Sequence, residues 1–232
     1  MRIYNNKFSD LGNNLQGSEI RRLFAISMKP GIISFAGGLP DPSSFPAEEV
    51  SQVSAKLVKS NGPTYLQYGG SKGSQEGINA ALSRMEKRGI KSAPENIIIT
   101  SGSQQAVNIV TQVFVDPGDT ILVEDPTFIG ALGVFRNAKA NVVGIPMDKD
   151  GIILDELKQI LNLQMAENKK VKFLYLIPNF QNPTGLTMSQ ERRQEVLEIA
   201  KEYDFFILED NPYGELWFEG GDELIKPIKA YD

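Results

Sequence analysis

The sequence predicts an α/β fold, a three-layer α/β/α sandwich whose sheet is mainly parallel. From Asn96 onward, short apolar runs alternate with longer segments in which apolar residues recur at helical spacing. The apolar runs are nearly continuous, which is typical of parallel strands buried on both faces. Strands and helices that alternate in this way place helices on both sides of one sheet.

The same pattern gives the expected elements in chain order. Strands are expected at 97–100, 120–123, 141–145, 171–177 and 205–208. Helices are expected between them, in the segment that carries Val107 to Phe114 and at 128–138, 154–166 and 189–203. The last helix begins near Thr187-Met188-Ser189-Gln190, which has the spacing of a capping box.

The N-terminal part is less regular. We expect helices at 18–28, 48–60 and 73–88, with a brief strand at 32–36. Pro30 and Gly31 end the first helix, and Gly89 ends the last one.

Composition limits the chemistry that this chain can perform. Its 232 residues are 41% hydrophobic and 23% charged, as in an ordinary globular protein. The net charge of −5 and the lack of any basic run argue against a nucleic-acid partner. With no Cys and no His, disulfides and thiolate metal sites are excluded, and acid–base steps need Lys, Tyr, Asp, Glu or a cofactor. No apolar run is long enough to span a membrane, so we expect a cytoplasmic protein with no membrane partner.

Four short motifs follow predicted strands. They are Ser101-Gly102-Ser103-Gln104, Asp125-Pro126-Thr127-Phe128, Asn182-Pro183-Thr184-Gly185 and Asp210-Asn211-Pro212-Tyr213. Ligands of open α/β sheets bind outside the carboxyl ends of the strands, so we expect these loops to converge on one ligand. Helix N-terminal amides, an aromatic face, an amide, a carboxylate and a phenol together suit a planar, phosphorylated ring that contains nitrogen.

The first two motifs offer a phosphate cradle and a ring face. Gly102 has no Cβ to block an anion at a helix N-terminus, and Ser103 adds a hydroxyl donor. Taken by itself, this motif is better explained as an ordinary Ser/Gly helix cap. Phe128 can lie flat against a bound ring, although a lone Phe beside a strand is more often a core residue.

The last two motifs offer polar groups for the ring's edge. The Asn182 amide can donate to a ring oxygen, and Tyr213 can donate beside it. The Asp210 carboxylate leaves an apolar strand, a position that is costly unless a cation or several donors meet it. A protonated ring nitrogen is a suitable partner for it. A turn-forming Asn, a capping Asp and a packed Tyr are the structural alternatives.

From about Ser18 to Phe218, the chain resembles the N-terminal part of fold-type I, class I/II aminotransferases, which use pyridoxal 5′-phosphate (PLP). The resemblance is greatest to the subgroup of 2-aminoadipate, kynurenine and aromatic aminotransferases. Ile33 to Pro40, then Tyr68-Gly69 and Gly73, then the four motifs occur in that subgroup's order.

The resemblance implies roles for individual residues. Cofactor contacts are implied for Tyr68, Gly102, Ser103, Gln104, Phe128, Asn182, Asp210 and Tyr213. Substrate contacts are implied for Arg21, Gly38, Tyr68 and Asn182. Tyr68 would reach the site of a partner subunit, because the family's sites form across a homodimer interface. Residues 1–47 would form an N-terminal arm or small-domain segment, and residues 48–232 an incomplete PLP-binding domain.

One expected residue is not found. The family's Schiff-base lysine follows a Ser-rich loop beyond the Asp-x-x-Tyr motif, and Lys226 and Lys229 lack that setting. We interpret both as solvated loop lysines and expect the chain to stop before the catalytic lysine. By itself it should bind PLP weakly at most and turn over no substrate.

The leading hypothesis is therefore an aminotransferase that moves an amino group between an amino acid and a 2-oxo acid. Another fold-type I PLP enzyme, such as a lyase or decarboxylase, shares the cofactor frame and stays open. A non-catalytic binding or regulatory module that keeps the fold is the third possibility.

Overall fold

The computed structural model describes residues 7–9, 12–13, 26, 29–33, 38, 40–218 and 226–232. The chain divides into two compact units, Met1–Tyr68 and Gly69–Asp232. The expected functional boundary between residues 47 and 48 stays a prediction. Within the described ranges, no helix has the length and apolar character needed to cross a membrane.

The first unit contains a short 3₁₀ helix, η2 (Pro42–Ser44), and the long helix α3 (Ala47–Tyr65). The expected helix at 48–60 is confirmed and continues past Asn61, whose backbone is not helical. No residue of α3 is buried. Of the strand expected at 32–36, Ile32 and Ile33 belong to no strand, and the other residues lie outside the described ranges. The helix at 18–28 lies outside those ranges too, except for Ile26, which is helical.

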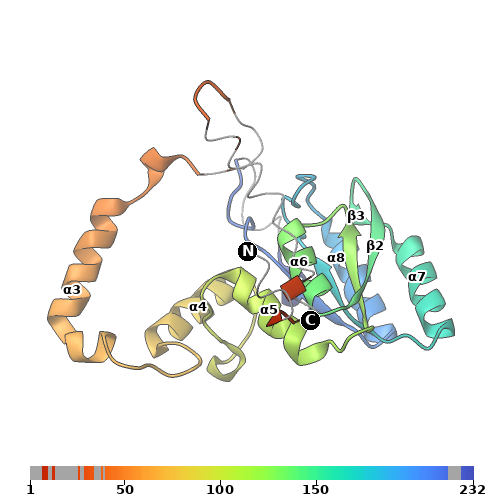
Figure 1. The fold of residues 1–232 in the computed structure, drawn as a ribbon, viewed down its shortest axis with the longest axis horizontal. Coiled ribbons are helices and arrows are strands. Elements are labelled where there is room, and N and C mark those ends of the chain that lie inside the picture. Colours follow the sequence, from red (N-terminus) through yellow and green to blue (C-terminus); the bar gives the residue numbers. More distant parts are fainter. Residues whose placement is uncertain are drawn as a thin grey trace. The chain divides into compact units, whose positions relative to one another are not determined.

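The second unit is built on a five-stranded sheet with the order β3-β2-β1-β4-β5. Figure 1 shows this sheet, with β2 and β3 labelled. The strands are β1 (Thr120–Asp125), β2 (Asn141–Asp148), β3 (Gly151–Ile152), β4 (Val171–Leu176) and β5 (Phe206–Glu209). β1 pairs in parallel with β2 and β4, β4 pairs in parallel with β5, and β3 runs antiparallel to β2. The chain moves outward from β1 to β2 and then continues on the other side of β1 with β4. The strand order therefore reverses between β1 and β4, which is where ligands bind in such sheets.

Helices cover both faces of this sheet, as predicted. α5 (Ser103–Phe114) and α6 (Ile129–Asn137) share one buried cluster with Ile121 and Phe173 of the sheet. α7 (Leu154–Ala166) and α8 (Gln190–Glu202) share the other cluster with Leu122 and Leu174. Adjacent residues of a strand therefore pack against helices on opposite faces of the sheet, because side chains alternate along a strand.

Serine side chains cap two of the helices, but the capping box expected at Thr187 to Gln190 does not form, because Thr187 Oγ1 accepts from the Phe180 N–H instead. Ser189 caps α8, its Oγ accepting a hydrogen bond from the Arg192 N–H. Ser74 caps α4 (Gln75–Lys87) in the same way, through the Gly77 N–H. Short 3₁₀ turns η3 (Pro94–Asn96) and η5 (Ile228–Ala230) complete the unit.

The strand expected at 97–100 was a wrong prediction. This segment belongs to no strand, and Ile98 and Ile99 are exposed. An apolar sequence becomes a strand only where a neighbouring strand supplies a ladder of hydrogen bonds. Among the described residues, the Ile99 N–H donates to the Lys72 carbonyl over 2.9 Å, but no ladder forms. The apolar sequence of β5 likewise does not give its burial. This strand lies at the sheet edge, and its Phe206 is 61% exposed. β3, only two residues long, was not expected.

Candidate functional site

The loops after β4 and β5 meet at the carboxyl end of the sheet. The Asn182 amide Nδ2 donates to the Tyr213 hydroxyl oxygen over 3.3 Å. Both side chains are half-buried, and Tyr213 also packs against the cluster under α5 and α6. The two groups predicted to share one ring oxygen therefore lie together.

Gln181 joins the loop after β4 to the loop after β1. Its Nε2 donates to the Pro126 carbonyl over 2.8 Å and to Glu124 Oε2 over 3.2 Å. Its Oε1 accepts from the backbone N–H and the hydroxyl of Thr184. The buried amide thus uses both donors and both acceptor positions. Gln181 holds the Asn182 turn and the loop before Phe128 in one arrangement.

Glu124 is a second polar residue that the sequence analysis missed. It is buried, with Oε2 accepting from the Ile177 N–H over 3.1 Å as well as from Gln181. Burial raises the pKa of this carboxyl to about 7, against the opposing effect of those hydrogen bonds. A carboxylate at the end of an apolar strand was the signal that singled out Asp210, and it applies equally to Glu124.

Asp210 follows β5 and is half-buried. Its Oδ2 accepts a hydrogen bond of 2.7 Å from the hydroxyl of Tyr175, in the neighbouring strand β4. Burial raises the pKa of Asp210, and the bond from Tyr175 lowers it. The Asp210 N–H continues the ladder by donating to the Leu176 carbonyl over 2.8 Å. The carboxylate is therefore fixed at the sheet edge by β4 and β5 together.

Phe128 caps α6 from the loop after β1, half-buried against the cluster that α5 and α6 share. Gly130 makes room for its ring, since a Cβ at this position would lie 2.5 Å from two ring carbons. Gln104 of α5 reaches the same place, its Nε2 donating to the Gly130 carbonyl over 3.0 Å. The first predicted motif is thereby linked to the second.

The N-terminus of α5 is open. Gly102 precedes the helix with φ of +85°, a conformation that L side chains rarely adopt, and no atom lies within 4 Å of where its Cβ would be. No side chain caps this helix end, and Ser103 is exposed. Uncapped amides beside an open space and a free hydroxyl suit a phosphate group.

Three predicted residues belong to the first unit. Tyr68 and Gly38 are exposed there, and Arg21 lies outside the described residues. Their places in the site stay predictions.

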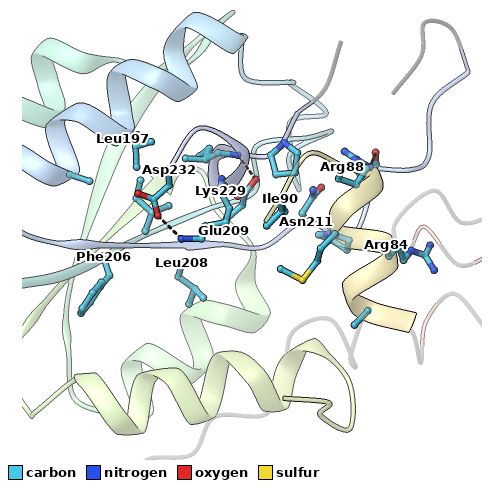
Figure 2. A pocket seen from close by; sticks show the side chains of 18 of the residues that line it. Arg84, Arg88, Ile90, Leu197, Phe206, Leu208, Glu209, Asn211, Lys229 and Asp232 are labelled. Atoms are coloured by element: carbon cyan, nitrogen blue, oxygen red, sulfur yellow. Dashed lines mark hydrogen bonds and ion pairs between the residues drawn. The ribbon is translucent and has the colours of Figure 1, made fainter. Parts of the chain in front are cut away.

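A cavity of about 1130 Å³ lies beside β5 (Figure 2). Side chains of α4, α8 and β5 line it, among them Arg84, Leu197 and Phe206. Its lining includes Asn211 but none of the residues predicted to contact a cofactor. Lys229 also borders it, and both Lys226 and Lys229 are exposed, as expected of solvated loop lysines.

Comparison with known proteins identifies the family. Residues 32–228 match the family described as aminotransferase class I and II. The aromatic-amino-acid aminotransferase 1 of Thermococcus litoralis is 42% identical over 99% of this chain and 55% of its own length. The 2-aminoadipate transaminase of Thermus thermophilus is 37% identical over 91% of this chain and 51% of its own.

Solved structures of aminotransferases are also similar to this chain. The crystal structure of Pyrococcus horikoshii kynurenine aminotransferase, in complex with PMP, covers all of this chain with a TM-score of 0.92 and 38% identity. The Thermus thermophilus α-aminoadipate aminotransferase LysN, complexed with N-(5′-phosphopyridoxyl)-L-leucine, gives a TM-score of 0.81 and 34% identity. The chain covers 57% and 52% of these two proteins.

The chain belongs to the class I and II aminotransferase family. It spans about half the length of the curated relatives that it matches.

Proposed function

We propose that the whole protein is a PLP-dependent aminotransferase that moves an amino group between an amino acid and a 2-oxo acid. One observation carries the proposal: the strand-end loops are joined by side-chain hydrogen bonds at the point where the strand order reverses. Gln181 links the loops after β1 and β4, and Asn182 links the loops after β4 and β5. The loops that carry the Asp210 carboxylate, the Tyr213 phenol and the Asn182 amide are thereby held together.

The residues present fit PLP. The open N-terminus of α5, with Gly102, Ser103 and Gln104, would bind the phosphate, and Phe128 would stack on the ring. Asn182 and Tyr213 would donate hydrogen bonds to the ring oxygen, and Asp210 would hold a proton on the ring nitrogen. The bound cofactor supplies an electron sink for negative charge at the substrate's α-carbon. An ionised Asp210 favours the protonated ring, with about 1.36 kcal/mol for each unit by which it raises the pKa of the ring nitrogen.

The names of the relatives support a substrate class of amino acids and 2-oxo acids, in the aromatic, kynurenine and 2-aminoadipate group. Within it we assign Gly38 and Asn182 to the substrate carboxylate, Arg21 to an acidic side chain, and Tyr68 to the site of a partner subunit. The proposal includes a cytoplasmic homodimer with no nucleic-acid or membrane partner. It also takes residues 48–232 as part of the PLP-binding domain.

We propose no role in the cofactor chemistry for the two lysines that follow the Asp-x-x-Tyr motif. Lys226 and Lys229 are exposed, and their backbone atoms serve structure: the Lys226 carbonyl accepts from Arg193, and the Lys229 N–H donates to Glu209. We therefore assign neither of them to the cofactor.

The test uses the full-length protein that contains this chain. Purified protein with added PLP is given 2-aminoadipate, kynurenine or an aromatic amino acid together with 2-oxoglutarate, and glutamate is measured by chromatography. We expect glutamate and the matching 2-oxo acid in equal amounts. Loss of carbon dioxide or an elimination product instead would indicate a decarboxylase or lyase. PLP binding without turnover on any of these donors would indicate a binding or regulatory module.

A further inference from the structure

Tyr175 is a buried tyrosine that lies beneath the candidate site and that the roles assigned so far do not use. It is 0% exposed, and its ring packs edge-on against Phe135 at a centroid distance of 5.5 Å. Its hydroxyl donates to Asp210 Oδ2 over 2.7 Å. A ring held this tightly gives its hydroxyl one position, and that position fixes one oxygen of Asp210.

The other oxygen of Asp210 is left available. No described residue donates a hydrogen bond to Asp210 Oδ1, and the residue is only partly buried. This oxygen is not one of the fully buried side-chain atoms that lack a partner, so it is open to a donor that enters the site.

Tyr175 can act as a donor at every working pH. Burial, reinforced by the neighbouring Asp210 carboxylate, raises the pKa of its phenol well above the ordinary value. The hydroxyl therefore keeps its proton, and its hydrogen bond favours the ionised form of Asp210. Glu124 and Tyr213 are the other titratable groups whose charge reaches Tyr175.

We propose that Tyr175 is a positioning residue, which holds Oδ2 of Asp210 so that Oδ1 is presented to the ring nitrogen of the bound cofactor. This inference rests on the proposed function, because it needs PLP in the site. Tyr175 touches neither cofactor nor substrate in this arrangement and acts through Asp210 alone.

The test compares Tyr175→Phe with wild type in the full-length holoenzyme. Phenylalanine keeps the ring packing against Phe135 and removes only the hydroxyl. Tyr231→Phe is the matched control, because its hydroxyl donates to Gln190 Oε1 over 2.9 Å, in a part of the unit that supplies no predicted cofactor contact. Each protein is loaded with PLP that carries an isotopically labelled ring nitrogen, and the nitrogen NMR shift is followed from about pH 6 to about pH 9.

In Tyr175→Phe we expect the ring nitrogen to lose its proton at lower pH than in wild type. Hydrogen bonds to charged groups are strong, so kcat should fall about 10-fold or more. KM should change less than about twofold, since the substrate contacts are untouched. Tyr231→Phe should match wild type in all three measurements.

A purely structural Tyr175 would lower the unfolding temperature of the apo protein and leave the nitrogen titration of the folded holoenzyme unchanged. That result overturns the proposal. A double-mutant cycle covers the case of a weakened Tyr175→Phe protein. In an Asp210→Asn background, a positioning effect on the ring nitrogen disappears, whereas a general structural loss persists.

The two proposals fail differently. If wild type neither binds PLP nor transfers amino groups, the proposed function fails, and this inference fails with it. If wild type does both and Tyr175→Phe behaves identically, only the role of Tyr175 is refuted.

Discussion

The two ends of the sheet treat their buried polar groups differently. At the amino end, Thr120 Oγ1 donates to Gln164 Oε1 over 2.8 Å and accepts from Asn141 Nδ2 over 3.1 Å. At the carboxyl end, Asp210 Oδ1 has no donor among the described residues, and the buried Thr127 Oγ1 has no partner there either. The Thr120 hydroxyl thus finds both its acceptor and its donor among neighbouring side chains, whereas Asp210 Oδ1 and Thr127 Oγ1 have no partner among the described residues.

This difference separates structure from function. A buried polar network whose members pair with one another stabilises the fold, and breaking it leaves an unsatisfied group. A network with unused donors and acceptors tolerates the cost of burial because a ligand can complete it. Substituting an internally paired group such as Thr120 should therefore lower stability, whereas substituting a group with an unused acceptor, such as Asp210, should mainly affect the cofactor chemistry.

The largest effect should separate Asp210→Asn from Thr120→Val. Losing the charge beside the ring nitrogen should lower kcat of the full-length enzyme by about 10²–10³-fold, the range for losing a preorganised electrostatic contact. Burial raises the pKa of Asp210, so the neutral Asn should not lower the free energy of unfolding. Thr120→Val should lower the free energy of unfolding by about 1–3 kcal/mol and leave kcat unchanged. Steady-state kinetics and urea denaturation measure both, and a large stability loss in Asp210→Asn would contradict the distinction.

Next in size is a pH effect at Glu124. Its folded pKa, about 7, lies above that of an ordinary unfolded Glu, so the folded protein binds the extra proton. Stability should be greatest below the unfolded value and decrease as pH rises through about 7, by about 3 kcal/mol at most for this carboxyl. Glu124→Gln should remove that part of the slope between about pH 5 and about pH 8, measured by urea denaturation. The exposed Glu198→Gln is the control and should keep the wild-type slope.

A matched pair of buried glutamines sharpens the comparison further. Gln181→Leu and Gln164→Leu should each lower the free energy of unfolding by about 1–3 kcal/mol, because each leaves buried polar partners unpaired. Only Gln181→Leu should also weaken PLP binding, about 10-fold, since it separates the loops that carry Phe128 and Asn182. Fluorescence titration of apo protein with PLP measures this. Equal PLP affinities in the two variants would show that Gln181 is purely structural.

The smallest effect should come from two glycines of α6. Gly130→Ala places a Cβ 2.5 Å from the Phe128 ring and should displace it, costing about 0.5–1.5 kcal/mol of stacking. PLP affinity should then fall about 2–10-fold. Gly133→Ala meets no atom within 4 Å and should only gain helix propensity, about 0.5–1 kcal/mol of stability. PLP titration and thermal unfolding distinguish the two, and unchanged affinity in Gly130→Ala would argue against ring stacking by Phe128.

Much of this architecture could be predicted from the sequence, because periodicity and strand ends are local properties. Helix α7 occupies the expected residues 154–166, and the sheet is mainly parallel as predicted. The contact between Asn182 and Tyr213 follows from one rule, that parallel strands end at the same edge of a sheet.

Other features depend on which strands become neighbours, and no local pattern gives that. Gln181 meets the Pro126 carbonyl only because β4 lies beside β1, and Tyr175 reaches Asp210 only because β5 lies beside β4. The prediction of a strand at 97–100 was wrong for the same reason, because apolar character does not show whether a neighbouring strand is present to pair with. Tyr175 lies within an apolar run of the sequence. Such a run predicts that the residue is buried, but it does not predict which group the hydroxyl contacts.

The position of β4 beside β1 also bears on how quickly the site can form. β1, α6 and β2 are close along the chain, whereas the Gln181–Glu124 hydrogen bond spans 57 residues and the Tyr175–Asp210 bond spans 35. Pairing of distant segments costs loop-closure entropy before the contacts between them can stabilise the chain, so such pairings form slowly. The β1–β2 half of the sheet can therefore fold ahead of the site, and the cofactor loops acquire their geometry only when β4 and β5 have joined it. PLP binding during refolding would report the last of these steps.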